Sequence, residues 1–286
     1  MSANRPPAVA GSFYPADPGR LTLELRHFLE AVKPVRFPHP NPLPEGEGAG
    51  GLLREFRVKA LIVPHAGYMY SGAIAASAYA TLRPIAARIR RVVLLGPTHR
   101  VAVSGLALPA ATTFTTPLGE IKLDTGAMRE LARLPQVVVS DAVHAQEHSL
   151  EVQLPFLQTV LQDFTLVPLA VGEATAGEVA AVLEQVWGGA ETLIVISSDL
   201  SHYLPAEVAQ RIDRATADEI LHLHPVPSHQ QACGATPVNG LLLAARRHHL
   251  VPHLLDLRNS GDTAGPHDSV VGYAAFALTG ENDHVH

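Results

Sequence analysis

The chain has 286 residues, of which 47% are hydrophobic and 17% charged, so it can bury a sizeable core and is not a disordered chain. Its formal net charge of -6 gives no support to nucleic-acid binding, and no apolar run approaches the roughly 20 residues of a membrane-spanning helix. A single cysteine, Cys233, excludes an internal disulfide, and the first residues lack the apolar centre of a signal peptide, so we expect a cytoplasmic location.

Taken in chain order, the sequence predicts helices that alternate with strongly apolar strands. The strands are expected at residues 58–64, 90–97, 164–172, 192–203 and 270–278. The helices are expected at residues 21–32, 72–85, within 151–162, and at 178–188, 206–223 and 236–249. Because fully apolar strands between helices indicate a sheet covered on both faces, we predict an α/β fold with a mainly parallel or mixed central sheet flanked by helices.

One segment does not fit this alternation. Residues 34–51, PVRFPHPNPLPEGEGAGG, are rich in proline, glycine and glutamate, so they are unsuited to a core element. We predict a mobile surface insertion there. Because the sequence shows no internal repeat and no linker between two cores, we predict that residues 1–286 form one domain.

Polar residues follow the apolar strands at the places where open α/β sheets bind ligands, outside the carboxyl ends of the strands. His65 follows the first inner strand and His99 the second, while Asp199 and His202 follow the fourth. A lone histidine after a strand is more often structural than a ligand. Three histidines and an aspartate on converging loops favour a functional site.

The stretch LIVPHAGYMYSG shows how such a residue would be presented. His65 stands at the end of a buried strand, which is a rigid support that projects the imidazole into the crevice. Gly67 allows the chain to turn at once, and Tyr68 and Tyr70 can form the wall of a pocket. This arrangement suits a metal ligand better than a core histidine.

Two further residues are candidates. His148 opens a helical stretch, and Cys233 lies just before a helix whose expected N-cap is Thr236 and whose expected first residue is Pro237. A helix N-terminus favours thiolate over thiol, and a thiolate is the form that binds metals. The alternative for a lone cysteine is a small buried hydrophobic residue.

An ordered set of motifs resembles the Memo family, whose prokaryotic members are called AmmeMemoRadiSam system protein B. The matching motifs are RPPAVAGSFYPADPGRL, VPHAGYMYSG, LGPTHR, TTPLGEIKLD, EHSLEVQLPFL, ISSDLSHY, CGATPVNG and SGDTAGPHDSVVGYAAFAL. They run from Arg5 nearly to the end of the chain. The likeness is weakest at residues 34–51.

The resemblance implies a fold like that of the class III extradiol dioxygenases, which hold Fe(II) with two histidines and a carboxylate. In Memo-like proteins a cysteine stands in place of the carboxylate. Position by position, the resemblance implies that His65, His99 and Cys233 are metal ligands. It also matches Asp199, His202 and His148 to polar positions of the family's site.

From this we expect a mononuclear His-His-Cys metal site with oxidoreductase chemistry on an unknown small molecule or peptide. The expected ion is Fe(II), which the likeness to the dioxygenases implies, or Cu(I), with zinc as an alternative; a thiolate makes the site softer and so favours Cu(I) or zinc over Fe(II). His202 would donate or accept protons. Asp199 would orient His202 or a bound water, and His148 would face the substrate.

The alternative is a non-enzymatic protein that uses the same cleft for metal handling or for a peptide or partner. The acidic balance does not favour a phosphopeptide, since phosphate recognition uses clustered Arg or Lys. By name, the family implies radical SAM and AMMECR-like proteins as partners.

Overall fold

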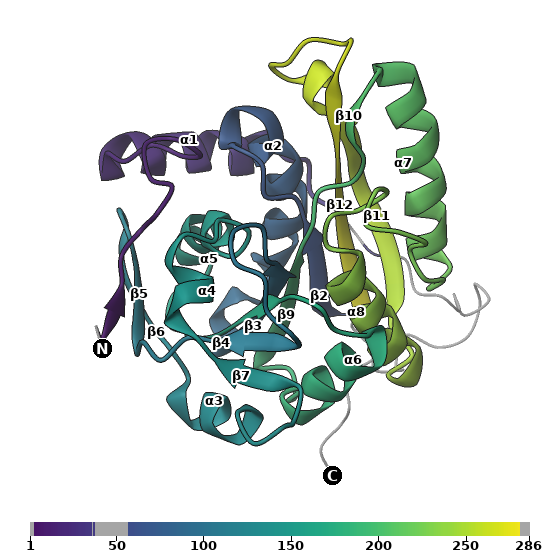
Figure 1. The fold of residues 1–286 in the computed structure, drawn as a ribbon. Coiled ribbons are helices and arrows are strands. Elements are labelled where there is room, and N and C mark those ends of the chain that lie inside the picture. Colours follow the sequence, from purple (N-terminus) through teal and green to yellow (C-terminus); the bar gives the residue numbers. More distant parts are fainter. Residues whose placement is uncertain (1–2, 36, 38–56, 281–286) are drawn as a thin grey trace, which may run out of the picture.

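The computed structural model describes residues 3–35, 37 and 57–280, and in them a mixed nine-stranded sheet forms the centre of the fold (Figure 1). The strand order is β10-β12-β2-β9-β3-β8-β4-β7, with β11 paired to β12. Four strands form a parallel central part: β2 (Arg57–Val63), β9 (Thr192–Ser197), β3 (Arg91–Pro97) and β8 (Thr165–Val171). The predicted mixed α/β architecture is confirmed.

The outer strands introduce the antiparallel pairs. Beside β8 lie β4 (Leu106–Leu108), antiparallel to it, and β7 (Val137–Val139), parallel to β4. Beside β2 lie β12 (Val270–Gly280), β11 (Val251–Asn259) and β10 (His202–Leu204), each antiparallel to its neighbour. A separate three-stranded sheet contains β1 (Asn4–Arg5), β5 (Thr113–Thr116) and β6 (Gly119–Lys122).

Helices cover both faces of the large sheet. Figure 1 shows α1 (Pro18–Ala31), α2 (Tyr68–Tyr79) and α5 (Leu154–Val160) on one side of β2 and β12, and α6 (Ala176–Gln185), α7 (Ala206–Leu221) and α8 (Ala235–Arg247) on the other. The shorter helices are α3 (Thr125–Leu131), α4 (Asp141–Ala145) and the 3-10 helices Ala80–Leu82, Ala86–Arg88, Glu151–Gln153 and Ser260–Asp262. No helix among the described residues is long and apolar enough to cross a membrane.

The central strands match the apolar runs of the sequence because both of their faces are covered. Val92 to Leu95 in β3 and Leu193 to Ile196 in β9 are at most 1% exposed. Strands buried on both faces are apolar throughout rather than at alternate positions. The end of each apolar run therefore marks the end of a strand, and the polar residues that follow it lie at the edge of the sheet.

Several predicted helix starts were too late in the chain, and two of them lie beside the candidate site. The helix expected at residue 72 begins at Tyr68, because Gly67 serves as its N-cap and its carbonyl accepts the first backbone bonds. The helix expected to begin at Pro237 begins at Ala235, with Gly234 as N-cap. Proline is tolerated in a first helical turn, where its missing N–H would have no partner, so it does not fix the first residue.

Most of the predicted insertion, namely residue 36 and residues 38–51, lies outside the described residues. Its mobility therefore stays a prediction.

Candidate metal site

The strands β2, β3 and β9 end at one edge of the sheet, and the residues after them meet in a cleft of about 550 Å³. Residues that line it include His65, His99, His148, Asp199 and His202. Four of these follow apolar strands in the sequence. His148 comes from the loop between α4 and α5, so its place in the cleft depends on tertiary packing.

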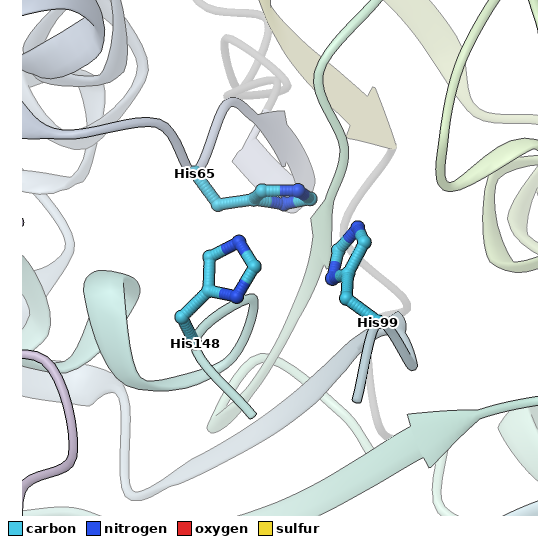
Figure 2. Close-up of side chains that lie close together, drawn as sticks. All are labelled: His65, His99 and His148. Atoms are coloured by element: carbon cyan, nitrogen blue, oxygen red, sulfur yellow. The ribbon is translucent and has the colours of Figure 1, made fainter. Parts of the chain in front are cut away.

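Three of the imidazoles that line the cleft form a cluster (Figure 2). One ring nitrogen from each of His65, His99 and His148 lies within 4.8 Å of the other two. Burial, with His99 adding to it, lowers the pKa of His65 to about 3, and burial beside His65 lowers that of His148 to about 4. Both rings are therefore neutral at pH 7, which is the form of histidine that binds a metal ion.

Glu147 organises one part of this cluster, although the sequence analysis did not single it out. Its carboxylate accepts hydrogen bonds from the backbone N–H of His99, His148 and Ser149, and its Oε1 lies 2.9 Å from His99 Nδ1. Burial alone would raise the pKa of Glu147, but these hydrogen bonds lower it to about 2. An ionised carboxylate can only accept, so His99 carries its hydrogen on Nδ1 and leaves Nε2 free.

His148 has an unusual ring environment. Its Nδ1 lies 3.3 Å from Glu147 Oε1, yet it is buried and forms no hydrogen bond with any described residue. The ring of Phe13 lies beside it, with ring centroids 4.8 Å apart. A buried polar nitrogen without a hydrogen bond is uncommon in a folded protein.

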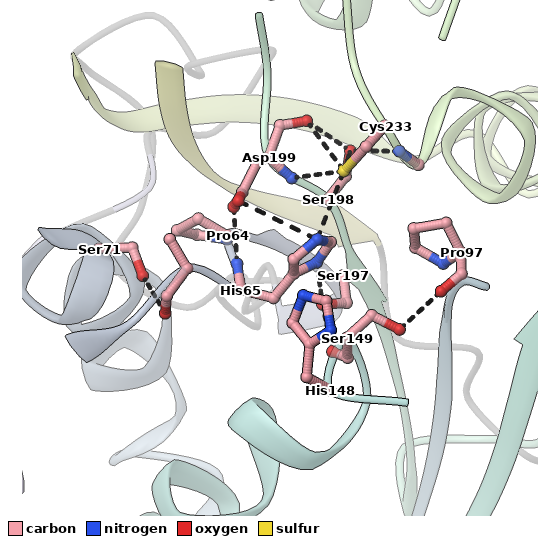
Figure 3. Close-up of polar contacts among 12 residues, drawn as sticks. Pro64, His65, Ser71, Pro97, His148, Ser149, Ser197, Ser198, Asp199 and Cys233 are labelled. Carbon is pink, nitrogen blue, oxygen red and sulfur yellow. Dashed lines mark hydrogen bonds and ion pairs between the residues drawn. The ribbon is translucent and has the colours of Figure 1, made fainter. Parts of the chain in front are cut away.

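Cys233 and Asp199 lie on the other side of His65 (Figure 3). Cys233 Sγ is 3.4 Å from His65 Nε2 and accepts the backbone N–H of Asp199 at 3.3 Å. Burial, reinforced by the charge of Asp199, raises the pKa of the Cys233 thiol to about 12. The expected thiolate is therefore wrong for the protein without a metal, because burial outweighs the effect of the nearby helix N-terminus.

Asp199 supports His65 rather than His202. Its Oδ1 accepts the backbone N–H of His65 at 2.7 Å, and its Oδ2 lies 4.0 Å from His65 Nε2. Burial raises the pKa of this carboxyl. His202 begins β10 and lines the cleft beside the exposed Tyr203.

The two tyrosines expected to form the pocket wall lie in different places. Tyr70 lines the cleft, but Tyr68 is only 2% exposed and donates its hydroxyl to the carbonyl of Val152 at 2.8 Å. The structure places Tyr68 in the core because α2 begins there and turns its side chain inward. Phe13, Tyr203 and Tyr273 line the cleft as well, and the sequence analysis did not identify them.

The N-terminal segment that carries Phe13, whose ring lies beside that of His148, is held in place by Glu151. This carboxylate is fully buried and pairs with Arg5 at 2.6 Å. It also accepts hydrogen bonds from the backbone of Ala8 and Val9 and from the hydroxyl of Tyr14. Because all its oxygens are satisfied, Glu151 serves to hold the segment and not to bind a ligand.

Comparisons with known proteins identify the family of the chain. The family model of Memo-like proteins matches residues 5–277. A MEMO1 family protein of Sulfolobus acidocaldarius is 35% identical over 94% of this chain and 97% of its own length, and one of Methanosarcina mazei is 36% identical over 96% and 98%. An uncharacterized protein of Escherichia coli K12, JW3007, superposes with a TM-score of 0.45 and 15% identity over 76% of this chain and 99% of its own. From the family match and these curated relatives, the chain belongs to the Memo-like protein family.

Proposed function

We propose that the protein binds one metal ion in the cleft and supports redox chemistry there on a small molecule or peptide. The observation that carries the proposal is the histidine cluster, in which His65, His99 and His148 offer nitrogens within 4.8 Å of one another. Imidazoles held this close, with His65 and His148 neutral at pH 7, are what a metal site requires.

His65 and His99 are the two ligands on which the geometry and the family resemblance agree. For the third ligand, the resemblance indicates Cys233 and the cluster indicates His148. We retain Cys233 as the anionic ligand, since its Sγ already lies against His65 Nε2. Its thiol would have to lose a proton on binding, and the positive charge of the ion would offset the effect of burial.

The donor set bears on which ion is bound. Imidazole ligands suit iron, copper and zinc, and a thiolate shifts the preference toward Cu(I) or zinc. We propose Cu(I) on the strength of the thiolate, or Fe(II) on the strength of the resemblance to the dioxygenases, with zinc as the alternative. When bound, such an ion supplies Lewis-acid or redox chemistry to a molecule in the cleft.

The protein's own side chains would position that molecule. Phe13, Tyr70, Tyr203 and Tyr273 provide aromatic surface along the cleft. His202, which lies in the lining and outside the histidine cluster, is placed to give or take a proton. Among the described residues that line the cleft there is no Lys or Arg, so a phosphorylated peptide is not favoured.

Anaerobic purification followed by elemental analysis tests the proposal. We expect about one equivalent of metal per chain, lost in His65→Ala and His99→Ala and kept in the matched control His222→Ala, which removes an exposed histidine on α7's C-terminal side. A chain that stays metal-free after anaerobic loading with Fe(II), Cu(I) and Zn(II) would contradict it.

The alternative is metal handling or partner binding without turnover. Oxygen uptake by the iron-loaded protein with catechols as substrates separates the two functions. Turnover supports the enzyme, while stable metal without uptake supports storage or partner binding. The radical SAM and AMMECR-like proteins implied by the family name are the partners we propose to test by co-purification.

A further inference from the structure

We infer that Ser197, oriented by Gln153, fixes His65 in the tautomer with its hydrogen on Nδ1, so that Nε2 presents its lone pair on the side of Cys233 Sγ. The role of this tautomer in metal binding rests on the proposed function, but the assignment of the hydrogen bonds does not. The groups involved belong to β9, to the turn before α5 and to α2. Tyr79, Gln153, Ser197 and Ser149 are fully buried, so water cannot replace any of their partners.

The carbonyl of Pro64 fixes the orientation of the Gln153 side-chain amide. Its Nε2 lies 2.8 Å from the carbonyl oxygen of Pro64 and 2.8 Å from Ser197 Oγ. A carbonyl can only accept, so the NH₂ group and not the oxygen of Gln153 must face Pro64. The hydroxyl of Tyr79 then donates to the remaining oxygen of Gln153 at 2.9 Å.

The Ser197 hydroxyl has a single hydrogen to donate. Ser197 Oγ lies 2.6 Å from the carbonyl oxygen of Ser149, which can only accept, so the hydroxyl hydrogen points there. Gln153 donates one N–H to Ser197 Oγ, and this occupies one of its two lone pairs. The other lone pair can only accept.

His65 Nδ1 is the group that this lone pair meets, at 2.9 Å (Figure 3). It must therefore donate, so the neutral ring carries its hydrogen on Nδ1. Free histidine in water holds the hydrogen mainly on Nε2, so the protein reverses the intrinsic preference. The hydrogen bond at one ring nitrogen decides which nitrogen can act as ligand or base.

Ser197 and Gln153 are thus positioning residues, since neither lines the cleft. They prepare the His65 lone pair before any ion arrives and remove the need for a tautomer change on binding. On the other side of the cluster Glu147 does the same for His99, so both rings present Nε2. Ser197 fixes the tautomer of His65 with a neutral hydroxyl, whereas Glu147 fixes that of His99 with a charged carboxylate.

The test is a two-bond ¹H–¹⁵N correlation spectrum of metal-free protein labelled with ¹⁵N-histidine, with the His65 signals assigned by their loss in His65→Ala. We expect the Nδ1–H pattern for His65 at neutral pH. In Ser197→Ala we expect a tautomer mixture dominated by Nε2–H. We also expect Zn(II) affinity to fall about 10–100-fold, as when a ligand loses its outer partner.

Two variants keep the test independent of folding. Ser197→Thr retains the hydroxyl and should restore the Nδ1–H signals. Tyr79→Phe removes a buried hydrogen bond from the same network but leaves Pro64 to orient Gln153, so it should lower thermal stability without changing the tautomer. An Nε2–H signal for His65 in the wild type, or an unchanged Nδ1–H signal in Ser197→Ala, overturns the inference. An Nδ1–H signal in a wild-type protein that binds no metal would instead defeat only the proposed function.

Discussion

The two sides of the histidine cluster are supported by different chemistry. On the Glu147 side, an ionised carboxylate holds the ring of His99 and the backbone of both His99 and His148. On the Ser197 side, His65 is held by a serine hydroxyl at Nδ1, and its Nε2 lies against the neutral thiol of Cys233.

The two sides differ in whether a negatively charged group is present when no metal ion is bound. A carboxylate partner raises the basicity of an imidazole, whereas a hydroxyl orients the ring without adding charge. The Glu147 side therefore already carries the negative charge that offsets a cation, and the Ser197 side acquires it only if Cys233 ionises. Whether Cys233 or His148 is the third ligand therefore decides whether the Ser197 side of the occupied site also carries a negative charge.

Removing a ligand should have the largest effect. We expect Cys233→Ala to abolish stable metal binding, as His65→Ala should, because each removes a group that touches the ion. Metal content per folded chain is the measurement, with thermal melts as the folding control. His148→Ala is the companion variant: full occupancy in Cys233→Ala together with metal loss in His148→Ala would replace the His-His-Cys set by three histidines.

The variant His202→Ala tests whether proton transfer depends on a residue outside both sides of the histidine cluster. We expect His202→Ala to lower any redox turnover by about 10²–10⁴-fold, the usual contribution of a positioned acid or base. Its metal affinity should fall by roughly 10–100-fold at most. Turnover is to be divided by bound metal in each preparation. An unchanged rate per bound metal, with a lower melting temperature, would show that His202 serves packing alone.

Glu147→Gln weakens one side of the cluster selectively. An amide offers one acceptor oxygen and two donor hydrogens, so it cannot accept all the N–H groups that meet the carboxylate. We expect metal affinity to fall about 10–100-fold. Glu184→Gln is the matched control, since Glu184 pairs with His248 at 2.9 Å outside the cleft. Equal effects of the two changes would mean that Glu147 has no special role.

The pH dependence of stability should separate the buried histidines, which include His144 outside the cleft, from Glu147. His65, His148 and His144 have pKa values lowered to about 3, 4 and 4 from 6.5, so the unfolded chain takes up protons first as the pH falls. Their stability contribution is complete above pH 6.5 and is lost toward about pH 4. The contribution of Glu147, whose pKa falls from 4.5 to about 2, is lost only below pH 4.5.

Thermal melts of the metal-free protein between about pH 7 and pH 4 check this expectation. The melting temperature should fall by several degrees across the histidine range, because one kcal/mol corresponds to a few degrees in a chain of this size. A constant or rising melting temperature between pH 6.5 and pH 5 would contradict it.

Much of the fold could be predicted because the central strands are buried on both faces. Their unbroken apolar runs gave the position of β2, β3, β8 and β9, and with them His65, His99 and Asp199. β11 was missed because its sequence, VPHLLDLRN, mixes charged and apolar residues, as suits a strand that is mostly only partly buried.

The supporting groups of the site were harder to predict. Glu147 stands beside His148 in the motif EHSLEVQLP, but adjacency in sequence does not reveal that its carboxylate reaches His99. Ser197 looks like the last residue of a strand, and Gln153 like one polar residue among many. Their roles depend on which donors and acceptors meet in the interior, and that is decided by tertiary packing.

The ion pair of Arg5 with Glu151 has a consequence for the order in which the chain is built. The two residues are 146 positions apart, so the amino-terminal segment emerges from the ribosome long before its partner is made. Contacts of such long range carry a loop-closure cost and form late in folding. Until that contact forms, the segment that carries Phe13 is not anchored beside His148. Because β9, Asp199 and Cys233 all follow Glu151 in the chain, the cleft can be completed only after every one of them has been made.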